Sequence, residues 1–328
     1  MTVATLPRLG FLGVGWIGRH RMEALAREGQ AQVAAVADPQ AEALEAAGEV
    51  APQAGRAASL EELLEHELDG IVIATPSALH ADQAVAALER GLAVFCQKPL
   101  GRDAEETRRA LRAAREADRL LAVDLSYRHV EALRAARTLA AGGEIGQVHS
   151  LDLVFHNAYG PDKPWFTRAE LAGGGCLIDL GTHLVDIALW LTGATEWEVE
   201  TARTLSLRGY EVEDQASAEL TLPGDVRARL ACSWFQPAGG ECAFECTAWG
   251  TEGAVSVRNV GGSFYDFRAE LWRGTSAETL VEPPDAWGGR AIGAWAQRLA
   301  SDNRYDPAAG ELELLAHVID DVYAEAGR

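Results

Sequence analysis

The sequence predicts an α/β protein, with a doubly wound parallel sheet in the N-terminal part and a mostly antiparallel sheet in an α+β domain after it. Two observations support this. Apolar runs of strand length alternate with helical segments over the first 125 or so residues, whereas later strands alternate apolar with polar residues. With 328 residues, 48% of them hydrophobic, the chain is long enough for about two domains.

The N-terminal elements follow one another in a regular order. Apolar runs occupy residues 9–14, 33–37, 70–75, 93–96 and 120–123, and helical segments such as 19–29, 81–91 and 104–117 lie between them. Strands that are buried on both faces and separated by helices are typical of a parallel sheet with helices on both sides. The N-terminal region is therefore expected to be a doubly wound domain.

The C-terminal elements follow a different pattern. Residues 215–222 and 226–234 each place apolar side chains at every second position, and Pro223-Gly224-Asp225 between them predicts a hairpin turn. Residues 149–155, 199–207 and 244–249 are further strand candidates, and 175–191 and 311–326 are helix candidates. The period of two indicates a sheet with one buried and one exposed face.

Charge and hydropathy exclude several classes of function. The net charge of -20 repels phosphate backbones and anionic lipids, so neither nucleic-acid nor membrane binding is expected. No apolar run approaches the roughly 20 residues that span a bilayer. Residues 1–8 show no basic segment followed by an apolar one, so no secretory signal is expected.

The five cysteines are scattered and odd in number, which suits a reducing compartment. A cytoplasmic location is therefore expected. Cys242 and Cys246 are close in sequence, but their segment is a predicted strand and no second Cys or His pair follows at zinc-like spacing. No metal site is expected.

A glycine-rich turn follows the first predicted strand. Gly13, Gly15 and Gly18 form a GxGxxG pattern, with Trp16 and Ile17 before the last glycine, and a helix follows. The first glycine permits a tight turn, the second lets the backbone approach a pyrophosphate, and the third lets helix and strand pack closely. The helix N-terminus offers free N–H groups and a positive dipole to the phosphates. These five residues are predicted to bind a dinucleotide.

The second predicted strand ends in Asp38, 20 residues after Gly18, where the ribose hydroxyls of the cofactor are expected. A carboxylate there accepts hydrogen bonds from both hydroxyls and repels a 2′-phosphate. Pro39 and Gln40 follow, so no arginine neutralises such a phosphate. NAD is therefore favoured over NADP.

Lys98 is one of only two lysines among 29 basic residues. Together with Gln97 and Pro99 it follows the fifth strand, on the edge where ligands of doubly wound folds bind. A hydroxyl that loses hydride also loses a proton, and a buried lysine near a positively charged nicotinamide can accept or relay it. Arginine cannot, because it stays protonated. Lys98 is a candidate catalytic residue; the alternative is a surface lysine without a role.

A run of three glycines, Gly173-Gly174-Gly175, precedes a predicted helix that contains Asp179 and His183. The two side chains are four residues apart, hence on one helical face. A histidine beside a carboxylate makes a tunable proton donor or acceptor, and the glycines would let a substrate approach the backbone. An ordinary Asp–His pair on a solvated helix is an equally good interpretation of the spacing.

Several other residues are expected to line the cofactor, because they follow strands that end at the same edge of the sheet. The glycine- and proline-flanked segment that contains Trp165 and Arg168 is expected to fold over the cofactor. His80, near a helix start, is also a candidate packing residue. The predicted lining residues are Thr75, Pro76, His80, Gln97, Tyr127, Arg128, Trp165 and Arg168.

The order of these motifs resembles the Gfo/Idh/MocA family, named after glucose–fructose oxidoreductase, inositol dehydrogenase and a rhizopine-catabolism oxidoreductase. The resemblance covers nearly the whole chain. It implies a dinucleotide-binding Rossmann domain over residues 1–125. Over residues 126–328 it implies an α+β domain for substrate binding and oligomerisation, with a large, mostly antiparallel open sheet; the last helix is a candidate to pack back on the first domain. The matching marks are Gly13 to Gly18, Asp38, Ala74-Thr75-Pro76, His80, Lys98-Pro99, Gly173-Gly174-Gly175, Asp179 and His183.

The resemblance also implies roles for residues. Lys98, Asp179 and His183 become the catalytic group, and a homodimer or homotetramer forms through the C-terminal sheet. The family usually has Glu where Gln97 stands; Gln keeps a hydrogen bond to a ribose and loses the negative charge beside Lys98. Some members carry tyrosine in place of His183, so the histidine moves this chain toward the inositol and sugar dehydrogenases.

The expected function is therefore an NAD-dependent dehydrogenase acting on CH–OH groups. It would transfer a hydride between NAD and a hydroxyl-bearing carbon of a sugar, cyclic polyol or related small substrate. Two alternatives keep the fold: an NADP(H)-dependent reductase and an oxidoreductase with a permanently bound cofactor. A third is a non-catalytic, dinucleotide-sensing regulatory protein, which the joint presence of Lys98, Asp179 and His183 disfavours.

Overall fold

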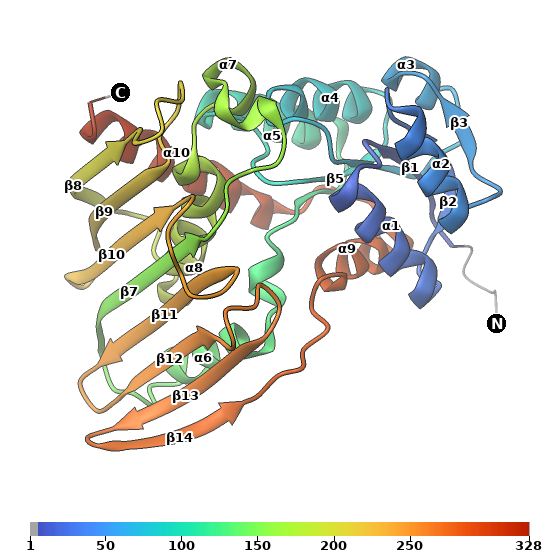
Figure 1. The fold of residues 1–328 in the computed structure, drawn as a ribbon. Coiled ribbons are helices and arrows are strands. Elements are labelled where there is room, and N and C mark those ends of the chain that lie inside the picture. Colours follow the sequence, from blue (N-terminus) through green and yellow to red (C-terminus); the bar gives the residue numbers. More distant parts are fainter. Residues whose placement is uncertain (1–5, 328) are drawn as a thin grey trace, which may run out of the picture. The chain divides into compact units, whose positions relative to one another are not determined.

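A computed structural model describes residues 6–327, which form two compact units (Figure 1). The first unit runs to Asp124 and includes Gly288–Glu313, and the second comprises Leu125–Trp287 and the chain from Leu314 onward. This differs from the predicted domains, because 288–313 was expected in the second. The last helix lies in the second unit from Leu314 on. The first five residues, on which the expectation about a secretory signal partly depends, lie outside the described range.

The first unit is built on a six-stranded sheet in the order β3-β2-β1-β4-β5-β6. All neighbouring strands pair in parallel, which confirms the doubly wound fold. The chain order reverses between β1 and β4, where such sheets bind ligands. The strands are β1 (Arg8–Leu12), β2 (Gln32–Ala37), β3 (Gly55–Ala57), β4 (Gly70–Ile73), β5 (Ala93–Cys96) and β6 (Leu121–Val123).

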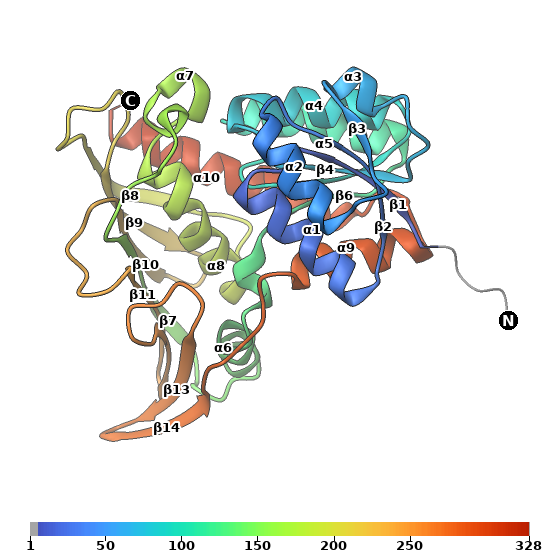
Figure 2. The same ribbon diagram turned by 45° about the vertical axis from the view of Figure 1, so that its right-hand side comes forward.

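Helices cover both faces of this sheet. Figures 1 and 2 show α4 and α5 on one face and α1, α2 and α9 on the other. The sequence predicts the position of α5 and, within a few residues, those of α1 and α4. The helices are α1 (Trp16–Glu28), α2 (Ala41–Val50), α3 (Leu60–Leu63), α4 (Ser77–Glu89), α5 (Ala104–Ala117), α9 (Arg290–Ser301) and the short turn η4 (Pro307–Gly310).

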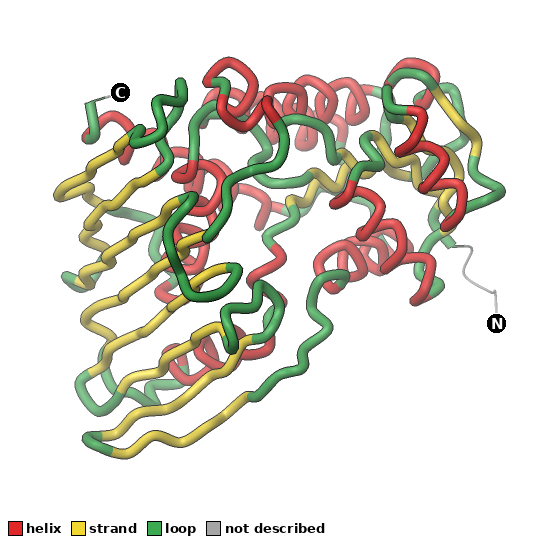
Figure 3. Tube along the Cα trace, viewed as in Figure 1, coloured by secondary structure: helices red, strands yellow, loops and turns green. Residues whose placement is uncertain are grey.

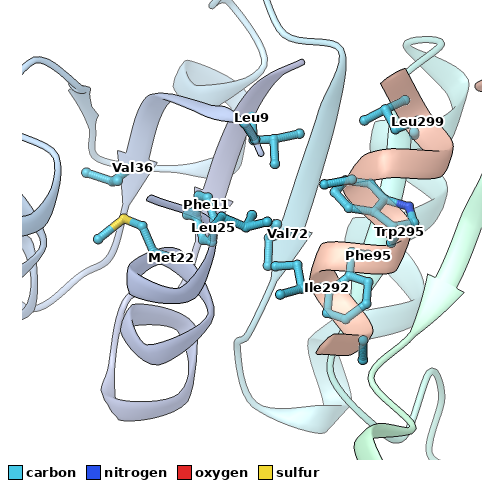
Figure 4. Packing of buried hydrophobic residues seen from close by; sticks show 14 of the residues in the cluster. Leu9, Phe11, Met22, Leu25, Val36, Val72, Phe95, Ile292, Trp295 and Leu299 are labelled. Atoms are coloured by element: carbon cyan, nitrogen blue, oxygen red, sulfur yellow. The ribbon is translucent and has the colours of Figure 1, made fainter. Parts of the chain in front are cut away.

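The core of the first unit explains why α9 belongs to it (Figure 4). Ile292, Trp295 and Leu299 on α9 are buried against the sheet, and the Trp295 ring centre lies 5.6 Å from that of Phe95 on β5. Each large apolar side chain buried in this way stabilises the fold by about 1.5–3 kcal/mol. Further members of this core are Leu9, Phe11, Met22, Leu25, Val36 and Val72.

The second unit is built on an eight-stranded sheet in the order β14-β13-β12-β11-β7-β10-β9-β8. Its neighbouring strands pair antiparallel except β7 and β10, which pair in parallel. The prediction of a mostly antiparallel sheet is therefore confirmed. The strands are β7 (Val148–Asn157), β8 (Glu198–Leu205), β9 (Gln215–Leu222), β10 (Val226–Ser233), β11 (Cys242–Gly250), β12 (Ala254–Asn259), β13 (Phe267–Arg273) and β14 (Ser276–Val281).

The predicted hairpin joins β9 and β10, with Gly224 and Asp225 at positive φ angles of 81° and 59°. Along these strands the apolar positions are buried and the alternate positions more exposed. The sequence patterns gave no element for residues 252–300, where the structure has β12, β13, β14 and α9.

Helices cover one face of the large sheet, and the helix and strand layers are distinguished in Figure 3. Helix α8 packs on β7 and β10, and α6 packs on β12, β13 and β14. The helices and helical turns are η1 (Ser126–His129), α6 (Glu131–Ala141), η2 (Pro164–Thr167), α7 (Ala169–Ala172), η3 (Leu177–Gly181), α8 (Thr182–Thr192) and α10 (Glu311–Glu325).

One helical stretch, Ala169–Thr192, is long and apolar enough to cross a membrane by length and composition. The expectation that no apolar segment reaches this length is therefore wrong. In the structure 89% of its apolar window is buried inside the protein. The stretch contains α8, which lies against the sheet as a core helix.

Candidate functional site

The glycine turn between β1 and α1 has the tight geometry expected from its sequence. Gly13 has a φ of +83° and donates its N–H to Ala37 O at 2.8 Å. A Cβ atom on Gly13 would lie 2.5 Å from Ala74 O, and one on Gly18 would lie 2.1 Å from Gly13 O. The first and third glycines are therefore required by backbone conformation and close packing.

Helix α1 begins directly behind this turn with an uncapped N-terminus. Gly15 is the N-cap residue, no side chain caps the helix, and no acidic residue lies in its first turn. The first N–H groups of a helix have no partner within the helix, and the macrodipole makes this end attractive to anions. The turn from Gly13 to Gly18, including Trp16 and Ile17, therefore fits a pyrophosphate.

Asp38, directly after β2, is tied to the glycine turn. Its Oδ2 accepts the Val14 N–H at 2.9 Å, and its Oδ1 accepts the Gln40 N–H at 2.9 Å. The carboxylate is half-exposed, so it keeps lone pairs for a ligand. These bonds hold the negative charge next to the start of α1, in the first unit's candidate ligand site.

The loops after β4 and β5 are joined by His80. Its Nδ1 lies 2.6 Å from Pro99 O, and its Nε2 lies 2.7 Å from Thr75 O. The ring is only 2% exposed, and burial lowers its pKa. Because both nitrogens are occupied, His80 is a structural tie between the two loops. The structure therefore favours the packing role over the predicted direct contact with a cofactor.

The neighbouring predicted residues keep their expected places at this edge. Thr75 and Pro76 follow β4, and the Thr75 hydroxyl donates to Gln83 Oε1 at 2.6 Å. Gln97 and Lys98 follow β5, and both are half-buried. The carboxyl edge of the first unit therefore carries the candidate proton-transfer lysine.

Two further residues join this edge that the sequence analysis did not single out. Arg21 on α1 donates its Nε–H to Asp124 Oδ2 at 2.5 Å, and Gln97 Nε2 donates to the same oxygen at 2.7 Å. Asp124 follows β6 and is 1% exposed. An Arg on the apolar side of α1 and an Asp directly after a buried strand are the sequence signals that mark them.

In the second unit, Tyr127 lies in an aromatic cluster. Its ring is buried, stacks on Phe244 at 5.4 Å and lies 4.7 Å from the His183 ring. Burial raises the pKa of the Tyr127 hydroxyl well above its usual value. The cluster includes Phe155 and Trp287, at 5.7 and 5.3 Å from Tyr127. Tyr127 therefore supports the His183 ring, and its predicted contact with the cofactor stays a prediction.

Arg128 is paired with a buried acid. Its Nε and Nη2 donate to the carboxylate of Asp186 on α8, at 3.0 and 2.6 Å. Asp186 is 1% exposed, and an uncompensated charge there would be strongly destabilising. This bidentate pair gives Arg128 a structural role, and its predicted contact with the cofactor stays a prediction.

Asp179 and His183 lie on either side of a change in helix type. Asp179 is in η3, a π-helical turn, and its Oδ2 accepts the Trp234 indole N–H at 3.0 Å. His183 is in the first turn of α8 and is 7% exposed. The alternative of a solvated helix pair does not fit this burial. Single π-turns inside helices occur frequently at functional sites.

At two of the three glycines before η3, other atoms of the protein occupy the space that a side chain would need. A Cβ on Gly175 would lie 1.8 Å from Glu213 O, and one on Gly174 would lie 1.9 Å from Tyr323 Oη. Glu213 is buried, and its Oε1 accepts N–H bonds from Gly175 and Leu177 and the Tyr323 hydroxyl bond, each at 2.9 Å. Gly174 and Gly175 are therefore required by close internal packing rather than by the approach of a substrate.

The remaining predicted residues lie on the segment before α7. Trp165 in η2 stacks on Phe166 with ring centres 3.8 Å apart. Arg168 is exposed, and its Nη2 lies 3.8 Å from a Glu170 oxygen. Neither residue is buried, so both remain candidates for ligand contact. Across residues 6–327, no group of three His, Cys, Asp or Glu side chains is close enough together to hold a metal ion.

Two family models match the chain and together cover most of it. The NAD-binding Rossmann fold of the GFO/IDH/MocA oxidoreductases matches residues 7–125, and the GFO/IDH/MocA C-terminal domain matches residues 133–256. The chain therefore belongs to the GFO/IDH/MocA oxidoreductase family, as its motifs predict.

The chain is 34% identical to the rhizopine catabolism protein MocA of Rhizobium meliloti, over 60% of this chain and 61% of that protein. It is 32% identical to 1,5-anhydro-D-fructose reductase of Ensifer adhaerens, over 62% of this chain and 61% of that protein. Each alignment thus spans less than two thirds of the relative. The fold is similar to that of KijD10, a 3-ketoreductase from Actinomadura kijaniata crystallised with NADP, with a TM-score of 0.87, 23% identity and 98% coverage of both chains.

Proposed function

We propose that this protein is a dehydrogenase that transfers a hydride between NAD and a hydroxyl-bearing carbon of a sugar or cyclic polyol. The observation that carries the proposal is the uncapped start of α1 behind the glycine turn, with the Asp38 carboxylate bound to Val14 N beside it. The Gly13–Gly18 turn would hold the pyrophosphate and Asp38 a ribose. When bound, the nicotinamide supplies the carbon that accepts or returns the hydride.

Three side chains are proposed to handle the proton that accompanies the hydride. In the oxidation direction, the Lys98 amine or the His183 imidazole takes the proton of the substrate hydroxyl. In the reverse direction, the same group returns it to the carbonyl oxygen. Asp179, with one oxygen bound by Trp234 N–H, is proposed to orient His183. Lys98 belongs to the first unit, and Asp179 and His183 to the second.

NAD is proposed over NADP, because a 2′-phosphate would lie against the Asp38 carboxylate. Asp38→Ser removes the charge and keeps a short hydroxyl that can hydrogen-bond. We expect the ratio of Kd values for NADPH and NADH, measured by nicotinamide fluorescence, to fall about tenfold or more in this variant. A wild-type protein that prefers NADPH would contradict this assignment and favour an NADPH-dependent reductase.

The enzyme assignment is tested by replacing each of the two lysines in turn. We expect Lys98→Ala to lose at least about 100-fold in kcat while retaining NADH binding. Lys163→Ala is the matched control, because Lys163 is exposed in the loop before η2, and it should leave kcat within twofold. A panel of sugars, inositols and sugar acids with NAD, followed at the nicotinamide absorbance, supplies the substrate. Binding of NADH without turnover of any member would instead favour a dinucleotide sensor.

A homodimer or homotetramer through the large sheet is also proposed. The sheet face opposite to α6 and α8 carries ordered polar and aromatic groups: Arg229 pairs with Asp152 at 2.8 Å, and the Trp249 and Trp272 rings lie 5.8 Å apart. Large, half-exposed aromatic residues and arginine are enriched in protein interfaces. Light scattering with chromatography should give at least twice the chain mass, and Trp272→Glu should lower it. A monomeric wild-type protein would contradict this proposal.

A cytoplasmic location is proposed from the cysteines. All five are free and buried, and burial raises the pKa of the Cys242 and Cys246 thiols to about 12. Unpaired thiols of this kind suit a reducing compartment. Fractionation of expressing cells tests the location, and recovery outside the cytoplasmic fraction would contradict it.

A further inference from the structure

The side chain of Gln97 is held by a buried ion pair. Asp124 receives the Arg21 Nε–H at 2.5 Å and the Gln97 amide N–H at 2.7 Å, both on Oδ2. Arg21 and Asp124 are 8% and 1% exposed, whereas Gln97 is half-buried at the end of β5. The pair therefore connects α1 and the end of β6 to the ligand edge of the sheet.

This contact fixes which way the Gln97 amide points. An amide has a donor NH₂ and an acceptor oxygen, and a carboxylate can only accept. Because Arg21 also donates to Asp124 Oδ2, that oxygen acts as an acceptor, and the Gln97 NH₂ must face it. The Gln97 Oε1 is then on the opposite arm of the planar amide. Within residues 6–327 the structure assigns this oxygen no hydrogen bond to the protein.

The position of Gln97 in the sheet indicates what such an acceptor could bind. A dinucleotide crosses a doubly wound sheet at its switch point, here between β1 and β4, with one nucleotide on each side. Asp38 follows β2 on one side of the switch, and Gln97 follows β5 on the other. Gln97 therefore belongs to the half that holds the second, nicotinamide nucleotide.

We propose that Arg21 and Asp124 are positioning residues that orient Gln97 so that its Oε1 accepts a hydrogen bond from a ribose hydroxyl of the nicotinamide nucleotide. This inference rests on the proposed function. The Asp124 charge acts on Gln97 and does not touch the cofactor. A neutral acceptor of fixed orientation thus stands beside Lys98 at the reaction edge.

The sharpest test removes the acceptor of the Gln97 amide or changes the amide itself. Gln97→Glu places two carboxylates at the distance of the present hydrogen bond, so at pH 8 we expect the NADH Kd to rise at least about tenfold. Asp124→Leu removes the oxygen that both Arg21 and Gln97 bind, so the Gln97 amide can adopt either orientation, and we expect a rise of about three- to tenfold. In the double variant Gln97→Glu/Asp124→Leu, no second carboxylate faces the introduced glutamate, and both of its oxygens are acceptors, which restores an acceptor facing the cofactor. Its NADH Kd should return to within about threefold of the wild-type value.

A pH series separates positioning from general damage to the fold. In Gln97→Glu the two acids share a proton at low pH, and the introduced glutamate, when neutral, then donates to Asp124 and presents its carbonyl as Gln97 does. Binding by this variant should therefore tighten between pH 8 and pH 5.5 relative to the wild type. The charged and titratable groups facing this site are Arg21 from α1, Asp124 after β6, and Cys96 and Lys98 beside Gln97; they are common to the wild type and this variant.

Control measurements separate a failure of the proposed function from a failure of the positioning role proposed for Arg21 and Asp124. Asp118→Asn breaks an exposed pair with Arg304 (2.9 Å) in the same unit and should leave the NADH Kd within twofold. If the wild type binds neither NADH nor NADPH, the proposed function fails and this inference with it. If the wild type binds, but the double variant is no better than Gln97→Glu, or Asp124→Leu leaves the Kd within twofold, the inference alone is overturned. If Asp124→Leu does not fold, the pH series on Gln97→Glu decides: a pH dependence like that of the wild type overturns it.

Discussion

Two glycine-rich segments lead into helices in this protein, and they serve opposite purposes. At Gly13–Gly18 no side chain caps α1, so its first N–H groups remain available to an anion. At Gly173–Gly175 the buried Glu213 carboxylate accepts the N–H groups of Gly175 and Leu177. A glycine run before a helix therefore indicates a ligand site only where the protein does not satisfy the exposed backbone donors itself.

The largest effect is expected when a methyl group is added at Gly175, in the segment where Glu213 already binds the backbone N–H groups. In Gly175→Ala the new Cβ would lie 1.8 Å from Glu213 O, a backbone atom that cannot rotate away. We expect the free energy of unfolding to fall by about 3 kcal/mol or more, measured by denaturant unfolding. Gly310→Ala is the control: no atom lies within 4 Å of its Cβ position, so its effect should stay within about 0.5 kcal/mol. A loss below about 1 kcal/mol for Gly175→Ala would contradict the packing described here.

The next largest effect should come from removing the Glu213 carboxylate, which accepts hydrogen bonds from the segment around Gly175. Glu213→Ala leaves the N–H groups of Gly175 and Leu177 and the Tyr323 hydroxyl without their acceptor. We expect a loss of about 3 kcal/mol of stability, because each unsatisfied buried donor costs about 1–3 kcal/mol. Glu211→Ala, which removes an exposed acceptor of the Ala169 N–H at 3.1 Å, should cost less than about 1 kcal/mol. Equal losses for the two variants would show that Glu213 has no special role.

A methyl group in the Gly13–Gly18 turn should affect NADH binding more than the stability of the protein. Gly18→Ala places a Cβ 2.1 Å from Gly13 O, a backbone atom, so the glycine turn itself must shift to relieve this contact. We expect a stability loss of about 1–2 kcal/mol and a rise of at least about 100-fold in the NADH Kd. Unchanged NADH binding in a folded Gly18→Ala protein would remove the distinction between the two segments.

The smallest predicted effect is on the pH dependence of stability, through His80, which joins the loops after β4 and β5. Burial lowers the pKa of His80 from 6.5, so on acidification the unfolded chain takes up a proton before the folded protein does. The stability that the neutral ring contributes is therefore present above pH 6.5 and is lost as the pH falls below it. Thermal unfolding at pH 7.5 and 5.5 should show a smaller pH-dependent loss in His80→Gln than in the wild type. The same decrease in both proteins would contradict this account.

The sequence predicts the first unit better than the second, for a physical reason. Strands buried on both faces are apolar throughout, so the runs around Ile71 and Val94 are visible without knowledge of their partners. Asp38 is found by its spacing from the glycine turn, which the fold determines locally. By contrast, α9 has an ordinary amphipathic pattern, and its place against Phe95 depends on contacts far apart in the sequence.

The contacts that the sequence does not predict are those in which two distant residues meet. Tyr127 and Arg128 follow β6 as expected, and they contact Phe244 and Asp186, respectively. Neither partner is near in sequence, so no local pattern reveals it. The pairing of Gln97 with Asp124 is of the same kind. Residue identity thus predicts the edge at which a side chain lies, and long-range contacts decide whether it is available to a ligand.

Helix α9 gives the first unit a divided primary structure with a consequence for protein engineering. A fragment ending near residue 125 would leave Phe95 without the Trp295 ring and is expected to aggregate. Gly288 lies beside Arg21, which bonds Asp124, so the two chain breaks of this unit are neighbours. A short linker from residue 124 to residue 288 would therefore yield a minimal, single-core nucleotide-binding module, obtained by excising the intervening segment rather than by truncating the chain.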